Sequence, residues 1–176
     1  DVVKVNLTAK EAAEAFMNGE VDIAVSYEPY VYEAISQGDA EVIFDTKNER
    51  GLIPDVLVVE EGKLEERRED FEKVVKAWFR AVDYLKNNHI EATTLIGERM
   101  GLTQEEYAAQ LSSLYILDLR DNITAFSVGS GFDSLYGSGR LISDFFLSKN
   151  LIEESPDITE MLDNSIVKDL YNTSSN

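Results

Sequence analysis

Short apolar runs alternate with helical patterns along the first sixty residues. The runs are rich in Val, Ile and Leu, which is typical of strands that are covered on both faces; they span residues 2–5, 21–26, 40–44 and 55–59. A capping-box pattern begins at Thr8 and predicts a helix that ends at Asn18-Gly19. Pro29 suits the first position of a second helix, which is predicted to run through Ser36 and to stop at Gly38. This β-α-β-α-β order predicts an α/β fold with a parallel sheet and right-handed crossovers.

The pattern becomes helical from Glu65 onward. Apolar residues then recur every three or four positions and predict a core-facing stripe, consisting of Phe71, Val74, Val75, Trp78, Phe79, Val82 and Leu85. Further helices are predicted over 90–100, 103–113, 132–149 and near 165–171, and the second of these begins with a capping box at Thr103. The helix over 132–149 is expected to bury Phe146 among others. Residues 114–130 show a mixed pattern that predicts no single element. We therefore predict a boundary near residue 60. Residues 1–59 form part of an α/β lobe, and residues 60–176 form a mainly helical segment.

Four residues are candidates for ligand binding. Tyr27 and Glu28 follow the predicted strand 21–26, at the carboxyl end where open α/β sheets bind ligands. The polar loop 46–54 leaves the same rim and carries Asn48 and Arg50. The alternative is that Tyr27 only packs, that Glu28 only interacts with the helix N-terminus, and that the loop is ordinary surface chain.

Composition narrows the classes of function. The formal net charge of −18 opposes binding to nucleic acid or to anionic membranes, because both require clustered Lys or Arg. The sequence has no cysteine, so thiolate metal sites, iron–sulfur clusters and a cysteine nucleophile are excluded. The single histidine, His89, follows a helical pattern and is expected at a helix end. Gly129-Ser130-Gly131 lacks the Gly-Lys-Ser/Thr ending of a phosphate loop and is expected to be a connecting loop. We expect no metal and no cofactor.

The order of several short motifs resembles a known family. These motifs are Asn18-Gly19-Glu20-Val21-Asp22-Ile23-Ala24, Tyr27-Glu28-Pro29-Tyr30, Pro54-Asp55-Val56-Leu57-Val58-Val59, the helix around Trp78-Phe79, Ser143-Asp144-Phe145-Phe146 and Leu151-Ile152. Together they resemble the periplasmic substrate-binding proteins of ABC importers for nitrate, taurine, sulfonates and thiamine precursors, the NMT1-like family. The resemblance extends from about Val5 to Tyr171.

The resemblance implies a periplasmic-binding-protein-like (type II) fold, in which two α/β lobes enclose a ligand. It places residues 1–59 in the second lobe, with 55–59 as the return crossover strand, and the helical segment against the first lobe. The chain is then expected to be a C-terminal portion, and the exposed lobe face is expected to favour self-association.

By the same resemblance, the protein captures a small polar solute and delivers it to an ABC permease in the membrane. Tyr27 would cover the solute, Glu28 would accept its hydrogen bonds, and Asn48 and Arg50 would contact it from the loop. The location would be periplasmic or extracytoplasmic, with a membrane-anchored lipoprotein as one form. One alternative is a ligand-sensing domain of a signalling or envelope protein. The other is an enzyme like the thiamine-pyrimidine synthases, which the absence of cysteine disfavours, so we expect no enzyme.

Overall fold

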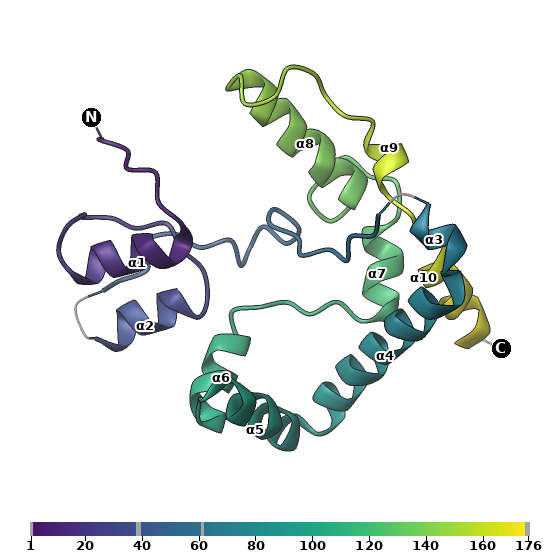
Figure 1. Cartoon of the computed structure of the whole chain (residues 1–176), viewed down its shortest axis with the longest axis horizontal. Helices are drawn as coiled ribbons and strands as arrows, with labels where there is room; N and C mark the ends of the chain where they lie inside the picture. Colours follow the sequence, from purple (N-terminus) through teal and green to yellow (C-terminus); the bar gives the residue numbers. More distant parts are fainter. Residues whose placement is uncertain (1, 38–39, 61, 175–176) are drawn as a thin grey trace.

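The computed structural model describes residues 2–37, 40–60 and 62–174. Within these ranges the backbone forms helices connected by loops, and it forms no strand (Figure 1). The helices are α1 (Ala9–Met17), α2 (Tyr30–Ser36), α3 (Lys63–Glu66), α4 (Arg68–Asn87), α5 (His89–Met100), α6 (Gln104–Leu111), α7 (Leu119–Ala125), α8 (Leu135–Ser148), α9 (Ile158–Met161) and α10 (Ser165–Ser174).

The four predicted strands do not form, so the α/β prediction is not met by this structure. A strand requires backbone hydrogen bonds to a neighbouring strand, and none joins residues 2–5, 21–25, 40–44 or 55–59 to another described segment. Their apolar side chains are also uncovered, since Val3, Val25 and Val58 are 90%, 89% and 81% exposed. The apolar composition was correctly recognised, but here nothing pairs with these segments or covers them.

The two predicted helices of the first sixty residues are confirmed. The Thr8 hydroxyl accepts from the Glu11 backbone N–H, and the Glu11 carboxylate accepts from the Thr8 backbone N–H, which forms the predicted capping box of α1. The helix ends at Asn18, and Gly19 follows with a φ of +72°. α2 begins at Tyr30, directly after Pro29. The predicted stop at Gly38 lies outside the described residues.

α1 and α2 contact each other and stand at one end of the molecule. The open segment 40–60 leads from this pair toward α3 and the remaining helices (Figure 1). The Ser26 hydroxyl donates to the Ala9 carbonyl oxygen at 2.8 Å, which fixes the end of the 21–26 segment against the start of α1. The boundary predicted near residue 60 stays a prediction.

The core of the helical part is narrower than the sequence pattern predicts. α4 buries Phe79 and Val82, but Trp78, predicted to be core, is 56% exposed. Phe146 on α8, also predicted to be buried, is 40% exposed. The buried positions of α8 are instead the small residues Gly137, Ser138 and Ser143. A broad apolar stripe is therefore present on these helices, and only part of it is covered.

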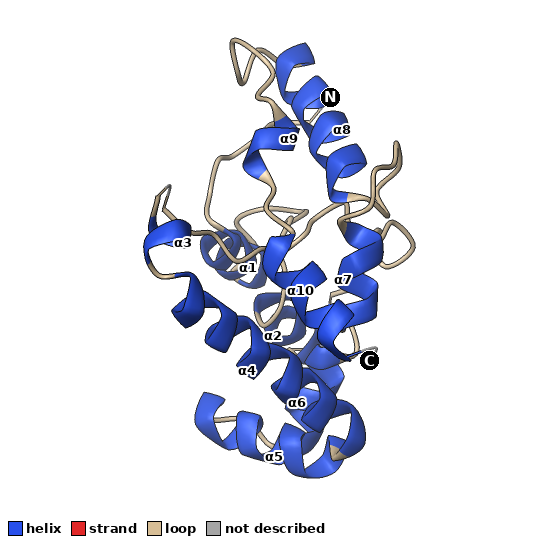
Figure 2. Ribbon diagram, turned by 90° about the vertical axis from the view of Figure 1, so that its right-hand side faces the viewer, coloured by secondary structure: helices blue, strands red, loops and turns tan. Residues whose placement is uncertain are grey.

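α10 packs alongside α4 and α7 (Figure 2). The Arg68 guanidinium of α4 donates to the Ser165 hydroxyl at 2.9 Å and forms an ion pair with Asp169 at 2.7 Å. Ile166 and Val167 of α10 are buried. The C-terminal helix is thereby joined to the first long helix of the segment.

α5 and α6 form a hairpin that agrees with the predicted boundaries. α5 begins at His89, as expected for a residue at a helix end, and ends at Gly101 with a φ of +74°. α6 begins after the capping box of Thr103 and Glu106. None of the helices in the described parts of the chain is long and apolar enough to cross a membrane.

α7 was not predicted, because residues 114–130 show no clear apolar periodicity. Its start is nevertheless a reciprocal cap, in which the Asp118 side chain accepts from the Asp121 N–H at 2.8 Å and the Asp121 side chain accepts from the Asp118 N–H at 3.2 Å. The spacing Asp-x-x-Asp was the available signal.

Candidate functional site

A cleft of about 500 Å³ lies between the 46–54 loop and the loop that precedes α8. One wall is formed by residues 47–50 and the other by Gly131, Phe132 and Asp133. The cleft thus contains two of the four predicted site residues, Asn48 and Arg50. Its volume falls within the range of small-molecule sites, which is roughly 300–1,000 Å³.

The 46–54 loop is shaped by two consecutive turns. The Glu49 N–H donates to the Thr46 carbonyl at 3.0 Å, and the Leu52 N–H donates to the Glu49 carbonyl at 3.1 Å. The Asp45 carboxylate accepts from the Lys47 N–H at 3.1 Å, an Asx-type contact that favours a turn. These bonds fold the backbone of 46–52 into turns, and the turns contain the cleft-lining residues 47–50.

Gly51 holds this loop against the opposite wall. Its φ of +83° lies in the left-handed region, and a Cβ at this position would overlap the carbonyl oxygen of Phe132. The Ser138 hydroxyl, whose residue is 1% exposed, donates to the Gly51 carbonyl at 2.5 Å. Only glycine permits this approach, and the contact joins residues that are 87 positions apart in the sequence.

The opposite wall is packed on the first turn of α8. The Ser134 hydroxyl donates to the Ser127 carbonyl at 2.6 Å and accepts from the Gly137 N–H at 3.4 Å. A Cβ at Gly137 would overlap the Gly131 carbonyl oxygen, so the loop lies directly on the helix. As predicted, Gly129-Ser130-Gly131 is a loop before a helix. Its part in the cleft was missed, because nothing in the sequence indicated contact with residues 47–50.

Arg50 is oriented by an aromatic ring. Its guanidinium carbon lies 4.0 Å from the centroid of the Tyr115 ring, a cation–π contact. The Tyr115 hydroxyl in turn donates to the Asp121 carboxylate at 3.2 Å, at the cap of α7. The N–H groups of a guanidinium lie in its own plane. When its face rests on an aromatic ring, they therefore point away from the ring and remain able to donate to a solute.

The same cap is joined to α4 by an ion pair. The Lys86 ammonium lies 2.7 Å from the Asp118 carboxylate. The hydrogen bond from Lys86 lowers the pKa of Asp118, and the Asp121 backbone N–H lowers it further. The same hydrogen bond, which the Lys86 ammonium donates to Asp118, raises the pKa of Lys86. Both residues therefore stay charged at neutral pH. Their ion pair anchors the start of α7, where Asp121 holds the Tyr115 ring that contacts Arg50.

Charges of both signs line the cleft. Lys47 and Arg50 are basic, and Glu49 and Asp133 are acidic, so the formal charges of the lining cancel. Lys47 also pairs loosely with Asp45 at 3.9 Å. A lining of this kind, with an amide at Asn48, favours a solute that offers both donors and acceptors over a bare anion or cation.

Tyr27 and Glu28 lie elsewhere and do not line the cleft. Tyr27 is exposed, and its ring is 5.8 Å from the ring of Tyr30. The Glu28 carboxylate accepts from the Tyr32 backbone N–H at 3.0 Å in the first turn of α2. The shared rim was expected from a sheet that this structure does not form, and Glu28 here makes the helix-terminal interaction that was the alternative interpretation.

No group of three or more acidic or histidine side chains in the described ranges is arranged to hold a metal ion. The cleft lining offers hydrogen-bonding groups and charges from its side chains.

Comparison with known families places the chain in one of them. The family model described as NMT1/THI5 like matches residues 1–92, which is more than half of the chain. The chain belongs to the NMT1/THI5-like family. No curated protein and no solved structure matches it.

Membership of the NMT1/THI5-like family is consistent with a solute-binding role and implies a periplasmic-binding-like fold. The matched range contains all four predicted site residues and the whole 47–50 wall of the cleft. The second wall, 131–133, lies beyond it. The family match thus supports the resemblance found in the sequence, and the structure adds a cleft that contains Asn48 and Arg50.

Proposed function

We propose that this chain is the solute-binding part of an ABC-type importer and that it captures a small polar solute between the 46–54 loop and residues 131–133. The observation that carries the proposal is the position of Asn48 and Arg50, predicted from the sequence as ligand contacts, in one cleft of suitable volume. Family membership supports a solute as the ligand.

In this proposal, the solute bridges two loops that are already in contact at Gly51. Arg50 donates from the edge of its guanidinium while its face stays on Tyr115. Asn48 supplies an amide, and Asp133 accepts from a donor of the solute on the far wall. The solute contacts groups that are more than 80 positions apart, so binding favours the arrangement in which both walls are in place.

The chain in this role binds its solute and does not convert it. It hands the solute to a permease in the membrane, and it works on the periplasmic or extracytoplasmic side.

The proposal is tested by calorimetric titration of the full chain with taurine, nitrate, an aminopyrimidine and a small primary amine. We expect saturable binding of a solute that has both donors and acceptors, as taurine and the aminopyrimidine do. Arg50→Lys keeps the charge and removes the planar fork, and Asn48→Ala removes the amide; each is expected to weaken binding by about tenfold.

Arg99→Ala is the matched control, because Arg99 is an exposed arginine in the last turn of α5, away from the cleft lining. It is expected to leave the affinity unchanged. Binding that is insensitive to Arg50→Lys and Asn48→Ala, or no saturable binding by any of the four solutes, would contradict the proposed site.

A further inference from the structure

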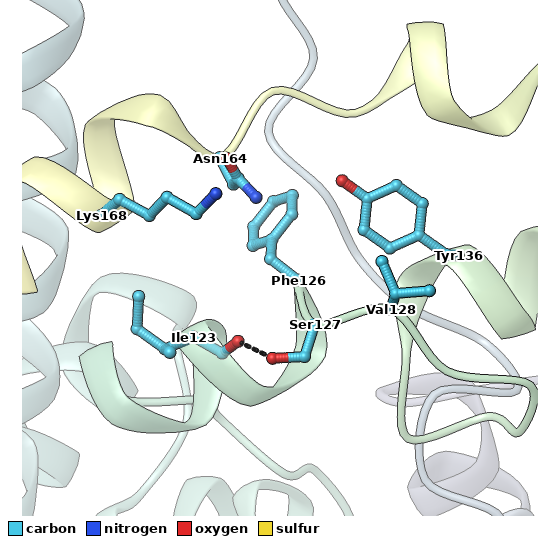
Figure 3. Close-up of a pocket in the computed structure, with 7 residues that line it drawn as sticks. All are labelled: Ile123, Phe126, Ser127, Val128, Tyr136, Asn164 and Lys168. Atoms are coloured by element: carbon cyan, nitrogen blue, oxygen red, sulfur yellow. Dashed lines mark hydrogen bonds between the residues drawn. The ribbon is translucent and has the colours of Figure 1, made fainter.

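A second cavity, of about 360 Å³, lies where α7, the loop before α8 and the start of α10 meet (Figure 3). It shares no lining residue with the 46–54 cleft. Its apolar surface comes from Ile123, Phe126 and Val128. The volume is again sufficient for a small molecule.

Three polar side chains border this apolar surface. In Figure 3 the Lys168 ammonium and the Tyr136 hydroxyl point from opposite sides toward Asn164 and the Phe126 ring. Ser127 also lines the cavity, but its hydroxyl already donates to the Ile123 carbonyl at 2.8 Å. The groups that can donate to a bound molecule are therefore an ammonium, an amide and a phenol.

Acidic residues next to Lys168 are already engaged elsewhere. Asp169 pairs with Arg68 at 2.7 Å, and Asp163 accepts from both the backbone N–H and the hydroxyl of Ser165. Within the described residues the Lys168 ammonium forms no ion pair. Its charge is therefore available to a bound anion.

We propose that this cavity binds a small carboxylate that has an aromatic body. The carboxylate accepts a charge-assisted hydrogen bond from Lys168 and neutral ones from Asn164 and Tyr136. The aromatic body lies against Phe126 and the aliphatic side chains of Ile123 and Val128.

Because the whole chain is strongly negative, an anion needs the Lys168 cation in order to bind in this cavity. A net charge of −18 repels an anion at long range, so an anion binds here only where a specific cation and donors offset that repulsion. A neutral aromatic amide of the same shape would gain the apolar contact but not the charge-assisted bond. The site therefore discriminates by charge, and this property can be measured.

The test is an NMR titration of the isotope-labelled full chain with benzoate, compared with its neutral isostere benzamide. Benzoate is expected to shift the amide signals of residues 123–128, 136 and 164–168 in a saturable way, and to bind about tenfold or more tightly than benzamide. Added salt is expected to weaken the binding of benzoate and to leave the binding of benzamide nearly unchanged.

Single-residue variants measure how much each polar group of the cavity contributes to benzoate binding. Lys168→Met keeps much of the side-chain length and removes the charge, and it is expected to weaken benzoate by about tenfold or more. Tyr136→Phe removes one hydroxyl and is expected to weaken it a few-fold. Lys149→Met, at the end of α8, is the matched control and leaves the affinity unchanged.

Three results would overturn the proposal: equal affinities for benzoate and benzamide, full benzoate affinity in Lys168→Met with an unchanged far-UV spectrum, or the absence of saturable shifts in residues 123–128, 136 and 164–168. Shifts confined to residues 47–50 and 131–133 would assign benzoate to the other cleft and would equally reject this one. The proposed importer function does not depend on any of these outcomes.

Discussion

Gly51 offers the sharpest test of how the two walls of the cleft are held together. Replacing it by alanine adds a Cβ at a left-handed backbone position, directly against the Phe132 carbonyl oxygen. The loop can adopt an allowed conformation only by moving away from Phe132. That movement also breaks the hydrogen bond that the Ser138 hydroxyl donates to the Gly51 carbonyl.

The matched control is Gly101→Ala. Gly101 has nearly the same backbone conformation, with a φ of +74° against +83°, but a Cβ there meets nothing within 4 Å. Both variants incur the left-handed penalty of roughly 1–2 kcal/mol, and both gain about 0.4–1 kcal/mol from restriction of the unfolded chain. These terms cancel in the comparison.

The remaining difference comes from the contact itself. Loss of a hydrogen bond to a shielded carbonyl costs about 1–3 kcal/mol, so Gly51→Ala is expected to lose about 2 kcal/mol more than Gly101→Ala. For a chain of this length that corresponds to a midpoint of thermal unfolding lower by about 4–8 °C. Circular dichroism during heating and denaturant titration measure the difference.

Ser138→Ala completes the comparison as a double-mutant cycle with Gly51→Ala. Because both variants break the same contact, their combined effect is expected to be smaller than the sum of the single effects. Equal stability losses for Gly51→Ala and Gly101→Ala, or additive effects of the two substitutions, would refute the contact as the link between the walls.

Three other predictions concern stability and association. Thr103→Ala removes the capping box of α6 and is expected to lower the free energy of unfolding by about 1 kcal/mol in denaturant titrations; no change would contradict the cap. The hydrogen bond that Lys86 donates to Asp118 lowers the pKa of Asp118. The stability due to this pair is therefore present above the ordinary Asp pKa of about 3.9 and is lost as the pH falls through the lower pKa of the folded state. Asp118→Asn is expected to flatten this dependence of stability on acid pH. Because Val25 and Val58 are exposed, the chain is expected to self-associate as its concentration rises, which sedimentation velocity measures. Replacing both valines by threonine is expected to reduce this self-association. A monomer at all concentrations would show that this surface stays solvated.

Local chemistry could be predicted from the sequence where a few neighbouring residues determine the structure. The capping boxes at Thr8 and Thr103 and the left-handed glycines after α1 and α5 agree with prediction, because a cap requires only residues within one turn. The helix that was missed, α7, is also capped locally, but by two aspartates instead of the usual Thr and Glu.

Features that depend on distant residues were predicted less well. The apolar runs around Val25 and Val58 predict strands only if other strands pair with them, and here none does. Trp78 lies on an apolar stripe that is wider than the surface covering it. Asn48 and Arg50 were predicted to share a rim with Tyr27 and Glu28, but the residues that face them across the cleft, 131–133, come from a loop far along the chain.

The central claim is that a solute binds between residues 47–50 and 131–133. Amide hydrogen exchange of the full chain, with and without the solute that titrates most tightly, tests it directly. We predict slower exchange in 46–54 and in 129–138 together, because one solute contacts both walls and Gly51 joins them through Ser138. Protection confined to residues 27–32 around Tyr27 and Glu28, with 46–54 and 129–138 unchanged, would contradict the claim.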